Sequence, residues 1–590
     1  MTTTTGAAIT DLNVIVAGQG GDGSLTVANV IADLLREMHF NIYTERDVLS
    51  RIKGGAAAAA LRASQAERYG LGDDVQLLVV FDASGIHNAA EHLSPGALVV
   101  YDDSDGPVPR GVLADSVDVA SAPFARMAVG ELSRPIFKSS IAIGFTAHAL
   151  GLSEAATRAA ISRRFERLGP TLRDANLRAV DMGFELARDR NACASYSLEA
   201  GAVVSDGRLE ISGNDALAFG FLAAGGRFFA GYPITPATDI MVWLDKQLPR
   251  FGGIVRQVED ELAAVNMAIG AALAGVRSMT ATSSPGFALM QEGITQAGSA
   301  EIPLVVVNVQ RGGPSTGLPT KPEQSDLEMI VYGGNGEYPR IVLTPGDPSD
   351  CFTLAVGACN LAERFQCPVI LALDQPTGQN MATVPPFDLS GIEIDRGKRL
   401  DATNVALLDV YQRYAMTDDG VSPYTVPATS GAVSLVTGNE HDEFGRVSTD
   451  AGNRMQMVGK RQRKLDEAVA HEQLPAGRIL GEPDAQVGLI GVGAVFGPAL
   501  EATERLGAQG VAAALLQPRT LWPVLTETLE FIRQHERVYV VEQNATGQLR
   551  KILVSEGADA ARMESILQFD GRPMRAGTIV DTVMRGGCAQ

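Results

Sequence analysis

Hydrophobic runs alternate with helical patterns from one end of this chain to the other. Near the N-terminus, Asp11 to Ala17 has the pattern of a buried strand, which turns through Gly18–Gly23 into a helix with apolar residues at helical spacing. We expect further strands at 75–81 and 97–101 and helices at 141–150 and 153–163. This alternation predicts a doubly wound α/β domain over residues 1–190.

The same alternation returns twice after a polar, irregular stretch at 191–213 that we interpret as a linker. A second α/β domain is predicted at 214–375, with helices at 214–224, 238–248 and 261–274 and strands at 278–281, 304–309 and 369–373. Residues 376–484 are rich in Pro, Gly and charge and are expected to form an extended excursion with little core of its own. A third α/β domain is predicted at 485–590, with strands at 487–490, 511–516 and 538–542 and helices at 494–506, 525–534 and 547–556.

Length and charge fit this three-domain α/β interpretation and exclude several partners. A chain of 590 residues is too long for a single core. A net charge of −20 disfavours nucleic acid, because phosphate binding needs a basic face, and also disfavours anionic membrane surfaces. The N-terminal residues lack the pattern of a leader, and no window has ~18 uninterrupted apolar residues. We therefore expect a cytoplasmic protein that binds neither nucleic acid nor membrane.

Five cysteines are present, without C-x-x-C spacing. Cys351, Cys359 and Cys367 recur at equal intervals, but the first two fall in a predicted helix and the third lies at the start of a strand. We expect thiols in a reducing cytosol and no metal site in this chain.

The Gly18–Gly23 turn has the G-x-G-x-x-G pattern between a strand and a helix, and Glu45 follows at the distance expected of a ribose-binding carboxylate. Three interpretations remain open: a nucleotide cofactor, an anionic group such as a CoA phosphate at the helix N-terminus, or tight packing alone. Within this turn Asp22, with the distant Asn41, loosely imitates a motif that holds Mg²⁺ and diphosphate. Their interval is shorter than that motif has, and no other Gly-Asp-Gly occurs, so the diphosphate half of such a site is expected in another chain.

The second domain contains three motifs suited to a buried ligand. Gly231–Pro236 is a turn in which prolines on both sides of Thr235 fix the backbone, so it presents a rigid hydroxyl or serves only as a cap. Acidic residues at 259–261 open a helix, where the helix dipole favours carboxylates in any case. Arg311 ends an apolar strand, and its planar guanidinium can hold a carboxylate or pair with Glu323 or Asp326.

This series, together with Ser315–Leu327 and Thr437–Gly445, resembles the alpha subunits of the 2-oxoacid:ferredoxin oxidoreductases, and among them the 2-oxoglutarate type. These thiamine diphosphate enzymes cleave 2-oxoacids to acyl-CoA and CO₂ and reduce ferredoxin. Gly18–Gly23 with Arg51–Gly55 resembles their gamma domain, here fused in front of the alpha domain. Val540–Asn544 and the residues after it resemble a transketolase C-terminal-like domain.

The resemblance assigns roles to individual residues. It implies that Glu261 binds the aminopyrimidine ring and thereby activates the cofactor, with Glu259 as the fallback candidate. It implies that Thr235 and Arg311 bind the carboxylate of the substrate. The other residues implied to line the cofactor site are Tyr232, Pro233, Ile234 and Ser284. Lys321, and alternatively His441, are candidates for the distal carboxylate of a dicarboxylic substrate.

The implied reaction is the oxidative decarboxylation of 2-oxoglutarate with CoA to succinyl-CoA, or the reverse reductive carboxylation of a reductive TCA cycle. The implied partners are ferredoxin and a beta subunit that carries the diphosphate site, Mg²⁺ and a [4Fe-4S] cluster, in a dimer of alpha–beta heterodimers. A pyruvate or broad-specificity 2-oxoacid enzyme is the nearest alternative. An NAD-dependent dehydrogenase, based on Gly18–Gly23 alone, and a non-catalytic scaffold are the alternatives from other classes.

Overall fold

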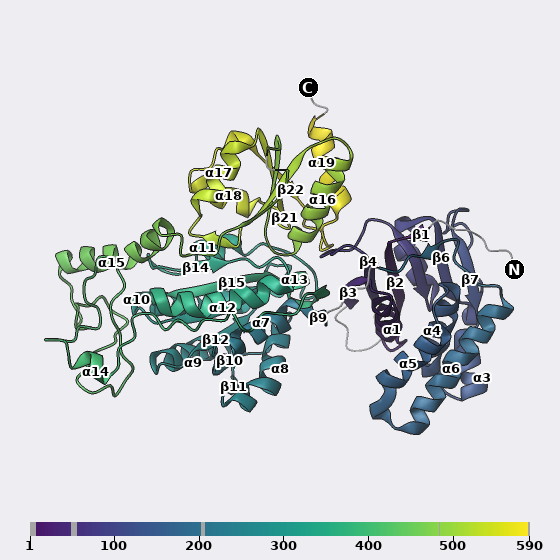
Figure 1. Ribbon diagram of the computed structural model, residues 1–590, viewed down its shortest axis with the longest axis horizontal. Coiled ribbons are helices and arrows are strands. Elements are labelled where there is room, and N and C mark those ends of the chain that lie inside the picture. The colour runs from purple at the N-terminus through teal and green to yellow at the C-terminus, as the bar shows by residue number, and fades with distance from the viewer. Residues whose placement is uncertain (1–7, 49–55, 202–206, 483, 588–590) are drawn as a thin grey trace. The chain divides into compact units, whose positions relative to one another are not determined.

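A computed structural model describes residues 8–48, 56–201, 207–482 and 484–587 (Figure 1). They divide into two units, Met1–Glu210 with Asn380–Pro385, and Ile211–Gln379 with Pro386–Gln590. The Arg51–Gly55 motif lies outside the described residues. Among the residues described, no helix is both long and apolar enough to cross a membrane.

The first unit is built on an eight-stranded sheet of order β7-β6-β5-β2-β4-β3-β16-β9. Its strands are β2 Asp11–Gln19, β3 Asn41–Val48, β4 Ala56–Ser64, β5 Val75–Val80, β6 Leu93–Asp102, β7 Asp118–Ala122, β9 Leu209–Ser212 and β16 Met381–Val384. Strands β2, β5, β6 and β7 are parallel, whereas β4 runs antiparallel between β2 and β3. A separate pair, β1 Ala8–Ile9 and β8 Ser197–Leu198, completes the unit's strands.

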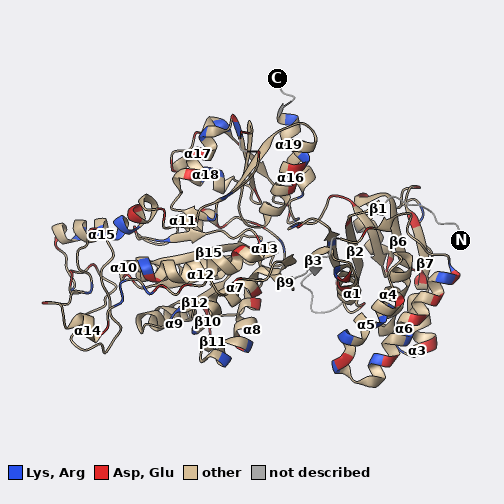
Figure 2. Ribbon diagram, viewed as in Figure 1, with Lys and Arg blue, Asp and Glu red and all other residues tan. Residues whose placement is uncertain are grey.

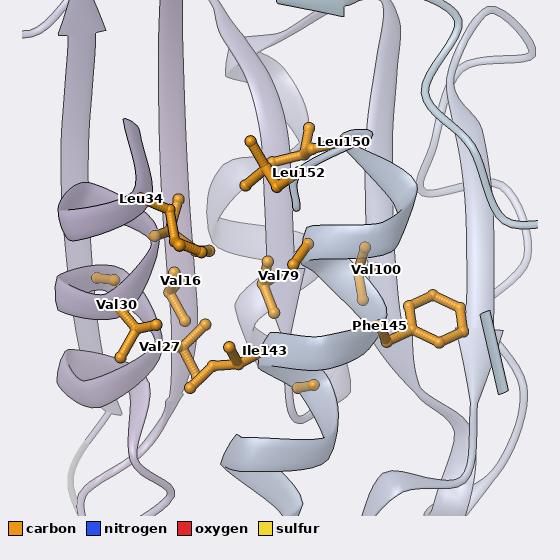
Figure 3. Close-up of a cluster of buried hydrophobic side chains, with 14 of the residues drawn as sticks. Val16, Val27, Val30, Leu34, Val79, Val100, Ile143, Phe145, Leu150 and Leu152 are labelled. Atoms are coloured by element: carbon orange, nitrogen blue, oxygen red, sulfur yellow. The ribbon is translucent and has the colours of Figure 1, made fainter. Parts of the chain in front are cut away.

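Helices cover both faces of this sheet because successive strand side chains point to opposite sides. One face packs on α1 Ser24–Glu37, α3 Phe124–Leu132, α4 Lys138–Ala149, α5 Glu154–Phe165 and α6 Pro170–Asp189. Figure 3 shows this core, in which Val16, Val79 and Val100 of the strands face α1 and α4. The other face packs on α2 Ala83–Ala89. Figure 2 shows many charged residues along α5 and α6.

The four-residue strand β16 comes from far along the sequence and lies antiparallel to β3, with Ala382 opposite Tyr43. The Ile42 N–H donates to Thr383 Oγ1 at 2.8 Å, and Asn380 Nδ2 donates to the Tyr43 hydroxyl at 2.8 Å. The sequence did not predict this strand, since it lies at the start of the presumed excursion. Its residues cover an edge of the sheet that a strand such as β3 would otherwise expose.

The second unit begins with a seven-stranded sheet of order β11-β10-β12-β13-β15-β14-β20, parallel except for β20. The strands are β10 Phe228–Gly231, β11 Ile254–Gln257, β12 Ser278–Thr282, β13 Leu304–Gln310, β14 Ile341–Leu343, β15 Pro368–Asp374 and β20 Thr520–Trp522. Helices α7 Gly213–Ala223, α8 Thr238–Gln247 and α12 Pro348–Phe365 pack on one face. Helices α9 Glu261–Leu273, α10 Ser284–Ser299 and α11 Leu327–Tyr332 pack on the other.

A five-stranded sheet, β17-β19-β18-β21-β22, forms the C-terminal part of the same unit. Its strands are β17 Arg478–Gly481, β18 Val487–Gly491, β19 Ala513–Gln517, β21 Arg537–Glu542 and β22 Met563–Leu567. Its helices are α16 Phe496–Ala508, α17 Thr526–Gln534, α18 Gln548–Ser555 and α19 Ala576–Gly587. Side chains of α17 and α18 share one hydrophobic core with α9 and α10, so the two sheets of this unit are packed together. The predicted α/β fold class is confirmed.

Two stretches are more ordered than their composition indicated. The presumed linker at 191–213 contributes β8 and β9. The presumed excursion contains β16, the short helices α13 Gln375–Gln379 and α14 Ala402–Val405, and the twenty-residue helix α15 Ala451–Ala470. It also has a small core of its own around Val405, Tyr411 and Ala432.

A fully buried ion cluster joins α15 to the turn between α10 and β13. Glu301 lies in this turn, and its carboxylate meets Lys460 Nζ at 2.7 Å and Lys464 Nζ at 2.6 Å, with all three side chains inaccessible to solvent. Arg413 donates to the Glu301 carbonyl at 2.6 Å. Burial alone would raise the pKa of Glu301, but these three cations hold it well below its usual range. Burial lowers the pKa of Lys460 to about 8 despite the attraction of Glu301.

Replacing Glu301 with Gln should destabilise the protein by about 3–5 kcal/mol, because it leaves buried lysines without a counter-charge. The free energy of unfolding can be measured with urea. The control is Glu292→Gln, a change at an exposed position of α10, which should alter stability by less than about 0.5 kcal/mol. A loss at Glu301 no larger than that of the control would show that the cluster does not anchor α15.

Candidate active site

The carboxyl ends of β10, β11 and β13 bring the three sequence motifs of the second domain to one edge of the sheet. With β12, these strands are parallel neighbours. The Gly231–Pro236 turn follows β10, the acidic residues 259–261 follow β11, the α10 N-terminus follows β12, and Arg311 follows β13. Ligand sites of open α/β sheets lie at this edge, so the arrangement favours a binding site rather than three unrelated turns.

Glu261 is the first residue of α9, and its carboxylate is buried beside α10. Asp260 caps the helix by accepting from the Ala263 N–H at 2.7 Å. The Glu261 side chain is 6% exposed, whereas Glu259 is exposed. A Cβ at Gly286 would lie 2.5 Å from Glu261 Oε1 and 2.1 Å from Thr282 Oγ1. Only glycine at 286 leaves room for this carboxylate, so the geometry favours Glu261 over Glu259 as the functional acid.

The turn that follows β10 is held through the carbonyl groups of its last two residues. Arg311 Nη1 donates to the Thr235 carbonyl, and Asn214 Nδ2 donates to the Pro236 carbonyl at 2.9 Å. The Thr235 side chain itself is exposed, as is Tyr232, while Pro233 and Ile234 are half-buried. Sequence reasoning missed Asn214. Its one visible signal is an amide at the start of an otherwise apolar helix.

Arg311 is 5% exposed and directs its guanidinium toward the turn. Its main-chain N–H donates to Ser284 Oγ at 3.3 Å. Burial lowers the pKa of Arg311, while the nearby Asp326 opposes the shift. The side-chain hydrogen bond goes to the Thr235 carbonyl, and among the described residues Nε has no hydrogen-bond partner. The guanidinium thus keeps a buried donor that no acceptor of the described residues satisfies.

Behind Arg311, the buried Asp326 joins Ser284 and Asn308. Asn308 Nδ2 donates to Asp326 Oδ2 at 3.1 Å, and Ser284 also donates to this carboxylate. Burial raises the pKa of Asp326, while these two hydrogen bonds lower it. The Ser284 hydroxyl is therefore engaged inside the protein, which makes support of Arg311 its structural role here. Its predicted contact with a cofactor stays a prediction.

The two candidates for a distal carboxylate have different environments. Lys321 belongs to the loop after Arg311, and its carbonyl accepts from the Gly312 N–H at 3.1 Å, so it lies in the neighbourhood of the site. His441 is fully buried and packs against Tyr414, with ring centroids 4.1 Å apart and the rings tilted by 50°, beside the Glu301 ion cluster. The predicted contact of His441 with a substrate stays a prediction.

The Gly18–Gly23 turn of the first unit is explained by contacts within the chain. Asp22 accepts from the Gln19 N–H at 2.9 Å and pairs with Lys138 at 2.8 Å. A Cβ at Gly23 would lie 2.8 Å from Ser139, at a positive φ of 85°. Packing thus accounts for Gly23, and a positive φ of 103° accounts for Gly21, without a nucleotide.

The strand order also separates the residues that a dinucleotide or a magnesium site would need together. Glu45 lies on β3, which is separated from β2 by β4 and so is about 10 Å away. Asn41 begins β3, at the opposite edge of the sheet from Asp22. Among the described residues no cluster of His, Cys, Asp or Glu could hold a metal ion.

Three of the described cysteines are buried thiols, which are unsuited to ligation. Within the described part of the chain Cys351, Cys359 and Cys367 are free and buried, and Cys193 is free and exposed. Burial raises the pKa of Cys359 and of Cys367 to about 12, which keeps both as neutral thiols. Cys588 lies outside the described residues.

Comparisons with known proteins identify the class of site. Residues 220–460 match the family model of the thiamine diphosphate-binding domain of pyruvate flavodoxin/ferredoxin oxidoreductase. Residues 13–186 match the model of pyruvate ferredoxin/flavodoxin oxidoreductase, and residues 477–553 match the transketolase C-terminal domain. The carboxyl edge described above is therefore part of a thiamine diphosphate-binding domain. Glu261, with room made by Gly286, fits the aminopyrimidine half of that cofactor.

Relatives along the full length define the family. The chain is 34% identical to subunit alpha of 2-oxoacid:ferredoxin oxidoreductase 1 from Aeropyrum pernix over 97% of each chain. It is 36% identical to the 2-oxoglutarate synthase subunit KorA of Methanothermobacter thermautotrophicus, over 64% of this chain and 98% of that one. A structure of 2-oxoglutarate:ferredoxin oxidoreductase from Magnetococcus marinus, with 2-oxoglutarate, coenzyme A and succinyl-CoA bound, matches with a TM-score of 0.92 and 33% identity over 98% of this chain and 99% of that one. The chain belongs to the alpha subunits of the 2-oxoacid:ferredoxin oxidoreductases.

Replacing Glu261 with Gln should slow exchange of the thiazolium proton by ~10²-fold or more in the assembled enzyme, the scale of a lost acid–base contact. Gly286→Ala should reproduce much of this loss with Glu261 intact, because the new methyl group displaces the carboxylate. The control is Gly357→Ala, since a Cβ there meets no atom within 4 Å. Exchange can be followed by NMR after a deuterium pulse. An unchanged rate in Glu261→Gln would remove this role from Glu261.

Proposed function

We propose that this chain is the alpha subunit of a 2-oxoglutarate:ferredoxin oxidoreductase that works in the cytoplasm with a separate beta chain. The beta chain would supply the diphosphate and Mg²⁺ site and a [4Fe-4S] cluster, and ferredoxin would accept the electrons. The products would be succinyl-CoA and CO₂, with reductive carboxylation as the reverse reaction. The observation that carries the proposal is the convergence of Glu261, the Thr235 turn and Arg311 at one sheet edge.

When bound, thiamine diphosphate supplies the nucleophilic carbon that attacks the keto group and stores the electrons of the cleaved bond. The residues of this chain would position and activate the reactants. Glu261, held beside Gly286, would hydrogen-bond the aminopyrimidine ring and hold the proton needed there. Arg311 would bind the carboxylate shared by all 2-oxoacids through its guanidinium. The rigid turn would present the Thr235 hydroxyl to the same carboxylate or to the ring.

The proposed beta chain follows from what this sequence contains. Its one Gly-Asp-Gly lies in the first unit, where Asp22 is paired with Lys138. The relatives named as subunit alpha, and the Magnetococcus marinus enzyme with its bound 2-oxoglutarate and coenzyme A, support both the division of labour and the substrate. A broader 2-oxoacid specificity is the alternative, since the relatives from Aeropyrum pernix and Sulfolobus are named only for 2-oxoacids.

The assembled complex should reduce a viologen dye in the presence of 2-oxoglutarate and CoA and should contain thiamine and iron. This chain purified alone should show neither tight thiamine diphosphate binding nor dye reduction. Both preparations can be compared by dye absorbance, isothermal titration and metal analysis. Turnover by the isolated polypeptide would contradict the two-chain proposal, and tightly bound NAD in either preparation would favour a dehydrogenase.

Arg311→Ala should lower kcat/KM for 2-oxoglutarate and pyruvate alike, because the carboxylate it binds is common to both. Lys321→Ala should selectively lower kcat/KM for 2-oxoglutarate by ~10-fold or more, since a charge-assisted hydrogen bond contributes about 1.5–3 kcal/mol. Steady-state kinetics with both substrates provides the comparison. If the Lys321 change affects the two substrates equally, Lys321 does not bind the distal carboxylate.

A further inference from the structure

The loop that follows Arg311 folds back on itself as a hairpin, so that Lys321 lies beside the start of the loop. The Gly312 N–H donates to the Lys321 carbonyl at 3.1 Å, and the Leu318 N–H donates to the Gly312 carbonyl at 2.8 Å. A Cβ at Gly317, where φ is 42°, would collide with the Gly312 carbonyl, so this close turn requires glycine. The hairpin therefore brings Lys321 next to the residue that follows Arg311.

The hairpin packs against a loop of the C-terminal part. Gly571 belongs to the loop between β22 and α19, and it is buried although Asp570 and Arg572 on either side of it are exposed. A Cβ at Gly571 would lie 3.3 Å from Leu318 Cδ1 and 3.5 Å from Lys321 Cβ. The loop of Gly571 is therefore the support against which Lys321 packs.

Gln543 is bonded both to this supporting loop and to the end of the segment that carries Lys321. Its side-chain Nε2 donates to the carbonyl of Arg572, the residue after Gly571, at 2.9 Å. The Gln324 N–H donates to the Gln543 carbonyl at 2.7 Å, and the Gln543 N–H donates to Gln324 Oε1 at 3.1 Å. Gln543 is 2% exposed and Gln324 is 1% exposed, so these hydrogen bonds are shielded from water.

The two kinds of contact respond differently to a substitution at Gln543. The pairing with Gln324 uses the main chain of Gln543 and does not depend on its side chain. The contact with the Arg572 carbonyl uses the side chain alone. This carbonyl also accepts from Gln568 Nε2 at 2.9 Å, so the loop keeps one donor when the Gln543 side chain is changed. A change of that side chain should therefore shift the supporting loop without unfolding it.

We propose that Gln543 is a positioning residue for substrate selection. Through the loop of Gly571 it sets the place of Lys321 beside Arg311, and so favours a 2-oxoacid that has a second, distal carboxylate. This inference rests on the proposed function, in which Arg311 binds the carboxylate next to the keto group and Lys321 binds the distal one. A charge-assisted hydrogen bond is strong only at close range and in good geometry, so a small displacement of Lys321 weakens binding of a dicarboxylate. Pyruvate has no distal carboxylate and is indifferent to the same displacement.

Gln543→Met tests this role in the assembled two-chain enzyme, because methionine keeps the length of the side chain and removes its donor. We expect kcat/KM for 2-oxoglutarate to fall by about 3–10-fold, the scale of one hydrogen bond, mainly through KM, and kcat/KM for pyruvate to stay within about 2-fold. In a Lys321→Ala background the same change should have no further effect on 2-oxoglutarate, since it acts through Lys321. Equal losses for both substrates, or losses that add to that of Lys321→Ala, would mean a purely structural role and would overturn the proposal.

Gly571→Ala is a second variant that leaves the side chain of Gln543 intact. Its methyl group would crowd Leu318 and Lys321, so it should reproduce the selective loss for 2-oxoglutarate. The matched control is Gly557→Ala, because φ is 97° there and 76° at Gly571, but a Cβ at Gly557 meets no atom within 4 Å. An equal effect of the two alanine changes on the ratio of kcat/KM for the two substrates would contradict the proposal.

Hydrogen exchange separates this inference from the proposed function. The amides of Leu318 and Lys321 are hydrogen-bonded inside the hairpin, and they should exchange faster in Gln543→Met than in the parent enzyme, whereas the amides of α9 should not change. Equal exchange of the hairpin amides in the two enzymes would refute the positioning role, whichever 2-oxoacid is oxidised. If the unmodified two-chain enzyme shows no thiamine-dependent oxidation of 2-oxoglutarate, the proposed function fails, even where faster exchange shows that Gln543 holds the hairpin.

Discussion

The buried contact of Glu301 with Lys460 and Lys464 sets the geometry of much of the second unit. Glu301 lies in the turn between α10 and β13. At the ends away from this turn, α10 carries Gly286 and β13 is followed by Arg311. Because the turn is held at one edge of the sheet, the helix and the strand are also positioned at the opposite edge, where the site lies. The buried ion pairs stabilise this arrangement only when both charges are present, since a buried charge without its partner is strongly destabilising.

A second network links the C-terminal sheet to the loop that follows Arg311. Gln324 ends this loop, and its amide donates to Asp374 at 2.7 Å and to the Val492 carbonyl at 2.8 Å. The Gln543 N–H donates in turn to Gln324 Oε1 at 3.1 Å. Asp374 ends β15 beside the site, so the C-terminal sheet supports the loop of Lys321. The transketolase-like part therefore has a structural explanation in this chain.

The sequence predicted the helices and strands whose hydrophobic residues follow one clear period. The strands at 304–309 and 538–542 and the helix that begins at Glu261 were found because their periodicity and caps are local properties. The position of Arg311 at a strand end was also visible, and the parallel order of the sheet then brought it to the Thr235 turn.

The features that sequence reasoning missed depend on distant contacts. Lys460 and Lys464 lie in a charged sequence that is typical of a solvated helix. Only the fold shows that both are buried against Glu301. The burial of His441 was missed for the same reason, because burial of a polar loop residue has no local signal. Gly286 is an unremarkable helical glycine until the Glu261 carboxylate is placed against it.

Strand β16 adds a distant segment of the chain to the first unit. Because residues 380–385 belong to that unit, the chain passes between the two units three times rather than once. A single break in the backbone before Ile211 would leave β16 paired with β3 through Ala382 and the Thr383 hydroxyl. Separating the two parts therefore requires breaking the hydrogen bonds between β16 and β3 as well as cutting a linker.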